Sequence, residues 1–415
     1  MSQTELQKLK VIENAAQGRI TVTEASQLLN LSTRQVKRWK ARYEPDGIEW
    51  VRHRNRGSRK PWALKPAIRR KIVALAKGKY AGFNDSHLTE KRVEVEELQV
   101  SRETVRRVLR KAGLAARQKR RPPKYRSRRE RKARRGMMVL TDASREDWLE
   151  GRGPILTLIG YQDDATGPVL AARFQLEHED TLGYLRQLRV LVEQYGIPLS
   201  LYRDQHGTFQ RNDPHWTAEE ELAGRQTPTQ FGRVLEELGI ESIRALSPQA
   251  KGRVERMWET FQDRLQSELR LAKARTVEEA NAVLEQFIEQ FNRRFGIVAR
   301  ERVSDFRPLS KELNADRIFS LRYERVVGKD HVIVFGAQAI QLPAQKGKFG
   351  YAGLRVELSH QLNGELVIWH QRQRLHSLPL ALGYEPGRAP RRPRAAVKKQ
   401  PRVYAFSGRP ALEVR

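Results

Sequence analysis

Cysteine is absent from the 415 residues of this chain, which excludes disulfide bonds and any zinc site built on thiolates. The chain also has no apolar run of about 18 residues, the length that a transmembrane helix needs. Residues 1–9 are polar and show no pattern of an export signal. We therefore expect a protein of a reducing compartment that has no membrane partner and no disulfide framework.

Acidic residues are scarce relative to basic ones. The sequence has 79 Lys and Arg against 49 Asp and Glu, a formal net charge of +30. An excess of this size indicates a polyanionic partner, and nucleic acid is the first candidate. The charge is concentrated in residues 117–135, a predicted arm where 12 of 19 residues are Lys or Arg and where Pro122 and Pro123 interrupt any helix. Residues 384–415 have the composition of a basic, flexible tail.

The first 50 residues predict a helix-turn-helix domain. A short amphipathic helix over Thr23–Leu29 is followed by a turn, and Ser32 is a candidate N-cap for a second, basic helix. The second helix of such a unit enters the major groove, so polar residues of its first turns reach base edges. The residues that we expect to contact DNA here are Thr33, Arg34, Gln35, Lys37 and Arg38.

A second unit of this kind is predicted over residues 65–116. Here Ser101 caps the basic helix, and Arg102, Thr104, Arg106 and Arg107 are the expected DNA contacts. Residues 51–64 form a basic linker suited to a minor groove, with Arg54 as its candidate contact. In the arm, the candidates for phosphate contact are Lys119, Arg120, Arg121, Lys124 and Arg126.

Residues 136–300 have a different, mixed α/β pattern. Short apolar runs predict five strands of a mixed sheet, at Met137–Leu140, Ile155–Ile159, Val169–Phe174, Leu199–Tyr202 and Ile243–Leu246. Helices are expected over Thr181–Tyr195, over Phe231–Leu238, from Ser247-Pro248 to about Leu271, and from Val277 to about Phe295. Residues 301–322 connect this core to short strands in 323–383, which we interpret as a small β-barrel.

Three acids occupy special places in this order of elements. Asp142 is expected at the end of the first strand, Asp204 at the end of the fourth, and Glu255 two turns into the helix after the fifth. If the first and fourth strands are neighbours, the two aspartates lie side by side and the helix brings Glu255 over them. Clustered carboxylates suit two Mg²⁺ ions, for which Mn²⁺ substitutes, and two such ions support phosphodiester chemistry.

Other acids compete for these roles. Glu259 lies one helical turn after Glu255 and is the best substitute if the register differs, whereas Asp263 is a further turn away. Asp163 and Asp164 lie in a turn, where a structural role is expected. His206 follows Asp204 closely, but a lone His there is more often a loop contact than a metal ligand. Lys251, Arg253 and Arg256 flank Glu255 and are candidates to hold DNA phosphates.

The residues around Glu255 resemble a known family. The run Ser247-Pro248-Gln249-Ala250-Lys251-Gly252-Arg253-Val254-Glu255 resembles the end of the integrase catalytic core shared by retroviral integrases and many insertion-sequence transposases. With its helix-turn-helix front and β-rich end, the whole chain is similar to bacterial transposases of the ISNCY group. The resemblance implies an RNase H-like fold, a DDE motif of Asp142, Asp204 and Glu255, magnesium dependence, and a bacterial, cytoplasmic protein at the nucleoid. It also implies double-stranded DNA as substrate, without a small molecule.

The chain departs from the family pattern in two ways. Asp204 and Glu255 are 51 positions apart (255 − 204), which is longer than the usual spacing, and the polar stretch 207–226 is the expected insertion. The Cys-containing zinc module of the retroviral proteins is absent.

The resemblance implies binding of a mobile element's terminal inverted repeats, two-metal DNA cleavage and 3′-hydroxyl transfer into target DNA by a homodimer or larger assembly. Three alternatives stay open: a nuclease or resolvase of the same fold, a transcriptional regulator with a degenerate core, and a Tyr or Ser recombinase.

Overall fold

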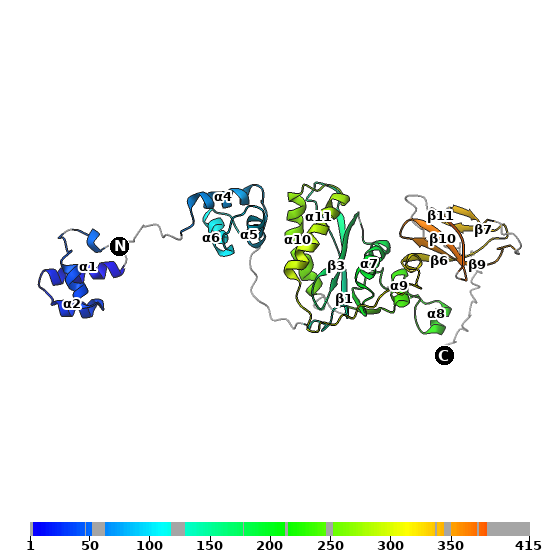
Figure 1. Cartoon of the computed structure of the whole chain (residues 1–415), viewed down its shortest axis with the longest axis horizontal. Coiled ribbons are helices and arrows are strands. Elements are labelled where there is room, and N and C mark those ends of the chain that lie inside the picture. Colours follow the sequence, from blue (N-terminus) through cyan, green and yellow to red (C-terminus); the bar gives the residue numbers. More distant parts are fainter. Residues whose placement is uncertain are drawn as a thin grey trace, which may run out of the picture. The chain divides into compact units, whose positions relative to one another are not determined.

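The computed structural model describes residues 3–45, 47–51, 63–117, 129–176, 178–211, 215–245, 252–336, 338–343, 350–371 and 373–379 (Figure 1). The chain divides into two compact units, residues 1–74 and 75–415, and each is described by itself. None of the helices in the described ranges is long and apolar enough to cross a membrane.

The first unit contains the predicted helix-turn-helix. Helices α1 (Gln3–Ala16), α2 (Val22–Leu29) and α3 (Thr33–Lys40) enclose a small core, and a 3₁₀ turn, η1 (Glu49–Val51), follows them. Thr21 forms a capping box with Glu24 at the start of α2, and the Ser32 hydroxyl accepts from the Gln35 N–H at the start of α3. The predicted cap at Ser32 is therefore confirmed, whereas α2 begins one residue earlier than expected.

The division between the units falls within α4 (Pro66–Lys77). The second unit begins with a further helix pair, α5 (Asp85–Glu94) and α6 (Arg102–Lys111). Ser101 caps α6 by accepting from the Thr104 N–H, as predicted. These helices lie within the predicted second helix-turn-helix domain, although its boundaries remain a prediction.

The centre of the second unit is a five-stranded mixed sheet of order β3-β2-β1-β4-β5 (Figure 1). Strands β1 (Val139–Glu146), β2 (Leu156–Asp163) and β3 (Val169–Leu176) form an antiparallel meander. Strands β4 (Ser200–Arg203) and β5 (Glu241–Arg244) add to it in parallel, β4 beside β1. The predicted mixed sheet is confirmed, with strands one and four adjacent.

Helices cover both faces of this sheet, because its strands alternate residues between two cores. Val139 and Ile159 pack with α7 (Thr181–Tyr195) and α9 (Gln230–Leu238) on one face. Leu140 and Leu158 pack with α10 (Gly252–Leu271) and α11 (Val277–Phe295) on the other. Figure 1 shows the two helix pairs on opposite sides of the strands. Helices α7 and α11 have the predicted bounds.

Several predicted strand bounds were wrong, and β2 continues to Asp163 although its predicted end was Ile159. β1 does not end at Asp142, because its antiparallel pairing with β2 continues from Asp142↔Gly160 to Glu146↔Leu156. β5 lies two residues earlier than predicted, because parallel pairing with β4 runs from Ser200↔Glu241 to Arg203↔Arg244. Asp142 is therefore in the middle of β1. The predicted N-cap of α10 at Ser247 lies outside the described residues.

Between β4 and α9, the predicted inserted stretch contains a short helix, α8 (Ala218–Ala223). Thr217 and Glu220 form a capping box at its start. Glu220 also accepts from the Thr227 N–H, and these backbone hydrogen bonds lower its pKa to about 2. The stretch is thus locally ordered where the structure describes it.

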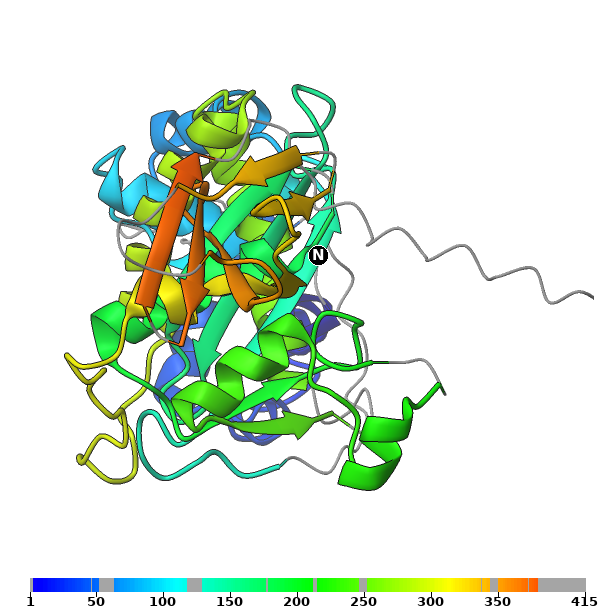
Figure 2. The same cartoon turned by 90° about the vertical axis from the view of Figure 1, so that its right-hand side faces the viewer.

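The C-terminal part follows α12 (Ala315–Ile318) and contains an antiparallel four-stranded sheet of order β11-β10-β9-β6. Its strands are β6 (Ser320–Val326), β9 (Arg355–Gln361), β10 (Glu365–His370) and β11 (Gln373–Pro379). A separate hairpin, β7 (Val332–Phe335) with β8 (Gln338–Gln341), packs into the same hydrophobic core as the four-stranded sheet. The sheet and the hairpin are the yellow-to-orange arrows of Figure 2. Among the described residues, strand pairing does not join the hairpin to the sheet. The predicted small β-barrel is therefore not confirmed, and β6 and β11 were missed.

Candidate active site

Asp142 lies on the sheet face that α10 covers. The indole N–H of Trp258 on α10 donates to Asp142 Oδ2 over 3.2 Å. The residue opposite Asp142 on β2 is Gly160, where a Cβ would lie 3.0 Å from the Trp258 ring. A glycine at this position leaves room for the indole, so the sheet, the carboxylate and α10 are fixed to one another here. Trp258 is buried in the core, and its contact with Asp142 was not predicted from the sequence.

Asp204 follows β4 directly and is held by its own loop. Its Oδ1 accepts from the His206 N–H over 2.8 Å. The guanidinium of buried Arg203 donates to the Asp204 carbonyl over 2.9 Å and to Gln210 Oε1 over 2.7 Å. These contacts orient the carboxylate and the chain that leads away from it.

The register of the sheet places the two aspartates at the same level along β1 and β4. β1 and β4 are parallel neighbours with Leu140 opposite Tyr202, and each aspartate lies two residues beyond its member of that pair (142 − 140 = 2; 204 − 202 = 2). The predicted side-by-side arrangement of Asp142 and Asp204 follows from this pairing. β3 is antiparallel to β2 and so runs parallel to β1; it passes the level of Asp142 at Ala172 and ends at Leu176, level with Glu146.

The chain after β3 carries Glu179, an acid that sequence reasoning missed. Burial raises the pKa of Glu179, the charges of Asp204 and Asp142 raise it further, and His206 lowers it. His206 Nε2 lies 2.8 Å from Glu179 Oε1. The signal was in the sequence: Glu179 precedes the N-cap Asp180 of a correctly predicted helix, just after a strand that runs parallel to β1.

Glu255 lies in the first turn of α10, with its side chain exposed to solvent. Among the described residues, no three His, Asp or Glu side chains are grouped closely enough to hold a metal ion. Exposed Arg256 donates to the Gly252 carbonyl over 2.7 Å. Lys251 and the side chain of Arg253 lie outside the described residues, so their predicted phosphate contacts remain predictions.

The competing acids fall into two groups. Asp163 and Asp164 are fully buried in the β2–β3 turn, where Asp163 accepts from the Gly136 N–H and Asp164 from Arg129 and the Lys132 N–H. Their predicted structural role is confirmed. On α10, Asp263 pairs with Arg117 at 3.4 Å, whereas Glu259 is exposed.

Comparison with known proteins gives the family. A sequence-family model described as a helix-turn-helix domain matches residues 7–60. A Sinorhizobium fredii protein named as a transposase, y4bF, is 36% identical over 382 residues, covering 91% of this chain and 81% of the relative. The transposase for insertion sequence IS1202 of Streptococcus pneumoniae is 31% identical over 386 residues, covering 84% of this chain and 80% of the relative. The chain belongs to the insertion-sequence transposases.

Two solved structures show weaker likeness to this transposase. The catalytic core domain of BIV integrase is 16% identical with a TM-score of 0.27, covering 39% of this chain and 88% of that one. A simian T-cell lymphotropic virus intasome in complex with a PP2A regulatory subunit is 12% identical with a TM-score of 0.32, covering 74% of this chain and 95% of that one.

The transposase exposes most of the polar residues predicted to meet DNA. On α3, Val36 is buried, while Thr33, Arg34, Gln35, Lys37 and Arg38 are exposed. On α6, Arg102, Arg106 and Arg107 are exposed, and the half-buried Thr104 hydroxyl lies 3.0 Å from that of Ser101. The remaining candidates lie outside the described residues: Arg54, Lys119, Arg120, Arg121, Lys124 and Arg126.

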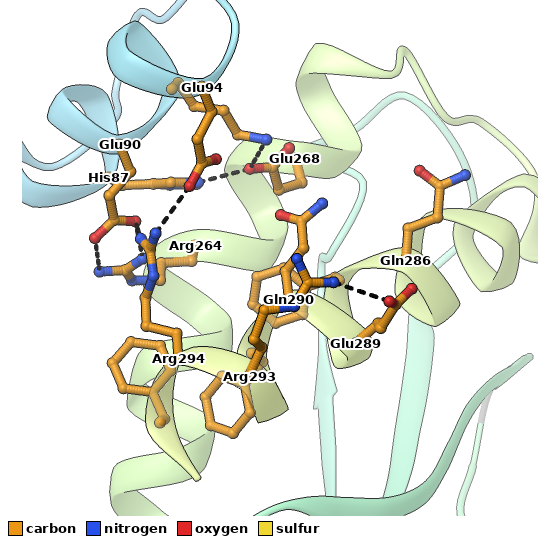
Figure 3. Close-up of a pocket in the computed structure, with 14 residues that line it drawn as sticks. His87, Glu90, Glu94, Arg264, Glu268, Gln286, Glu289, Gln290, Arg293 and Arg294 are labelled. Carbon is orange, nitrogen blue, oxygen red and sulfur yellow. Dashed lines mark hydrogen bonds and ion pairs between the residues drawn. The ribbon is translucent and has the colours of Figure 1, made fainter. Parts of the chain in front are cut away.

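The second helix pair of the transposase contacts the far half of α10 through charged groups (Figure 3). Glu268 accepts from His87 Nε2 over 2.6 Å and pairs with Lys91 over 2.8 Å, and Arg264 pairs with Glu90 over 2.5 Å. Burial lowers the pKa of His87, although the hydrogen bond to Glu268 and its charge act in the opposite direction. Burial works against the charge of Glu268, but hydrogen bonds from His87 and Lys91 outweigh it and lower its pKa. A pocket of about 520 Å³ adjoins these residues and does not include the aspartates.

Proposed function

We propose that this DNA transposase acts through Asp142, Asp204 and Glu255, and that it cleaves DNA at the ends of a mobile element and transfers the freed 3′-hydroxyl to target DNA. One observation carries the proposal: the two aspartates lie on adjacent parallel strands, and Trp258 ties the helix that bears Glu255 to one of them. This arrangement supports a site in which carboxylates from distant parts of the sequence act together.

Donor chemistry supports magnesium as the cofactor. Asp142 and Asp204 offer hard carboxylate oxygens on neighbouring strands, which suits Mg²⁺ or Mn²⁺. We propose that these two residues hold two Mg²⁺ ions and that Glu255, exposed in the first turn of α10, completes the ligand set when DNA is bound. Bound metal supplies activation of the attacking oxygen and stabilisation of the leaving oxygen.

The proposed reaction has two steps, hydrolysis of a DNA strand and transfer of the freed 3′-hydroxyl. In the first, water adds to the phosphorus at the element end, and the bond from that phosphorus to the 3′-oxygen breaks, which leaves a free 3′-hydroxyl. In the second, this hydroxyl attacks a phosphorus of target DNA, a new ester bond forms, and the target strand's own 3′-oxygen leaves. The side chains of the site orient the phosphate, and no covalent link between protein and DNA is required.

DNA recognition falls to the helical part in this proposal. The exposed polar residues of α3 and α6 would enter major grooves of the terminal inverted repeats, and the basic linker before the second helical domain and the arm after it would contact the DNA backbone. Because two element ends must be joined, we propose that a homodimer or larger assembly forms on DNA. Action on chromosomal DNA would place the protein at the nucleoid of a bacterial cytoplasm.

A strand-transfer assay tests the proposal. Purified protein, an oligonucleotide ending in the element's repeat, plasmid target and Mg²⁺ are combined, with Asp142→Asn and Asp204→Asn alongside. The matched control is Asp147→Asn, an exposed aspartate just beyond β1. We expect joined products from wild type and control, and DNA binding without joining from the other two. Nicking alone by the wild type would favour a nuclease of this fold, and binding without chemistry would favour a regulator.

A further inference from the structure

The loop after Asp204 is fastened through both nitrogens of the His206 ring. Nε2 lies 2.8 Å from Glu179 Oε1, and Nδ1 accepts from the Thr208 N–H over 3.4 Å. A neutral imidazole protonated on Nε2 satisfies both contacts, because one nitrogen then donates and the other accepts. The His206 backbone N–H is the group that donates to Asp204 Oδ1. One residue thus joins the Glu179 carboxylate to the Asp204 carboxylate.

Glu179 is itself anchored to the core. The hydroxyl of Tyr184 donates to Glu179 Oε2 over 3.2 Å, and Tyr184 is 1% exposed. The Tyr184 ring also packs edge-on against Phe209, with centroids 4.8 Å apart. Tyr184, a residue of α7, therefore contacts the Asp204 loop in two ways. Its hydroxyl holds Glu179, which contacts His206, and its ring packs against Phe209.

We propose that Glu179 and His206 are positioning residues that hold Asp204 in its reactive orientation, a role that rests on the proposed function of Asp204. Each Glu179 oxygen has a donor on the protein, Oε1 facing His206 and Oε2 facing Tyr184. These contacts favour an orienting role over metal ligation, because an oxygen with a protein donor would have to exchange that contact to bind metal. The raised pKa of Glu179 fits a carboxyl group buried close to two other acids.

Hydrogen–deuterium exchange of the full-length protein, without DNA or metal, measures the loop directly. In Glu179→Ala we expect faster exchange in peptides covering residues 204–211, because the His206 ring loses its anchor. Glu179→Gln should exchange like the wild type, since an amide accepts from His206 through its oxygen and donates to the Tyr184 hydroxyl through its nitrogen. Glu193→Gln, at the exposed far end of α7, is the matched control and should change nothing here. Unchanged exchange in Glu179→Ala would overturn the proposal.

Strand-transfer kinetics give the second readout. We expect kcat to fall about 10- to 100-fold in Glu179→Ala, the cost usual for residues that orient metal ligands, with little change in KM for DNA. Glu179→Gln should restore kcat to within about threefold of the wild type. If Glu179→Gln is as impaired as Glu179→Ala, the carboxylate charge acts directly and the positioning role is wrong.

The two readouts separate this inference from the proposed function. If Asp204→Asn stays active, the proposed function of Asp204 fails whatever exchange shows. If Asp204→Asn is inactive while Glu179→Ala leaves both exchange and kcat unchanged, only the positioning role fails. His206→Gln provides an independent variant, for which we expect the same faster exchange, because the terminal amide has no acceptor at the position of Nδ1 and cannot contact both Glu179 and the Thr208 N–H.

Discussion

The two halves of α10 treat their acidic residues differently. The first half carries Glu255 and Glu259, both exposed, and meets the sheet through Trp258 and its hydrogen bond to Asp142. The second half carries Asp263 and Glu268, which pair with basic residues that precede the sheet in sequence. An acid on this helix is thus structural or available for chemistry according to what lies opposite it, and helical position alone does not decide which.

The largest expected effect is on chemistry at the first half. Glu255→Gln should reduce strand transfer by about 10³-fold or more, as expected for loss of a catalytic group, and leave the free energy of unfolding within about 0.5 kcal/mol of the wild type. Strand transfer and chemical denaturation on the same preparation measure both. Glu259→Gln is the matched exposed variant and should retain activity; a loss there with Glu255→Gln active would exchange the two roles.

The second half should show the opposite pattern. Glu268→Gln removes the charge that Lys91 faces at 2.8 Å, with both side chains largely buried, and should lower the free energy of unfolding by about 3 kcal/mol. Denaturation of the full-length protein measures this loss. At a temperature where the variant remains folded, its strand-transfer rate should stay near that of the wild type. A large loss of rate without loss of stability would contradict the division of α10 into two halves.

A smaller effect is expected at the junction with the sheet. Trp258→Phe keeps the apolar packing but removes the N–H that donates to Asp142, and should slow strand transfer about 10-fold. The change should appear in kcat, because the missing contact orients a carboxylate and does not touch DNA. Phe261→Leu, in the same core but without a polar contact, is the control that reports on packing alone.

The smallest effect concerns pH at the second half. The lowered pKa of His87 means that the folded state binds fewer protons than the unfolded one, so stability is complete above the unfolded value of about 6.5 and decreases as pH falls below it. Glu268, with its pKa also lowered, loses stability in the same direction below about 4.5. His87→Gln should therefore flatten the decline in the free energy of unfolding between pH 7 and pH 5.5. A decline as steep as that of the wild type would assign it to other groups.

Much of the fold was predictable, because its elements carry local signals. Caps at Ser32 and Ser101 and the bounds of α7 follow from capping residues and from apolar periodicity, whereas the adjacency of β1 and β4 entered the prediction only as a condition. The end of β1 was not predictable from its own residues, since Thr141–Glu146 become a strand by pairing with distant β2. The same applies to β6, whose mixed polar sequence is a strand because β9 lies beside it.

The candidate site also has features that could be predicted from the sequence and features that could not. The placement of Asp142 and Asp204 was predicted on the condition that β1 and β4 are neighbours, and the pairing of these strands meets that condition. The contacts of Glu179, Trp258 and Arg203 depend on side chains meeting across elements, and no local pattern reports them. The grouping of Glu255 with the aspartates stays a prediction.

The position of Asp142 inside a paired strand has a consequence for how the gene can change. Successive residues of β1 face opposite cores, so inserting or deleting a single residue between Val139 and Asp142 would turn the carboxylate to the other face, away from Trp258. The stretch after Asp204 is where the long interval between Asp204 and Glu255 predicts an insertion. Length variation among related transposases should therefore accumulate between β4 and α9 and be absent from β1.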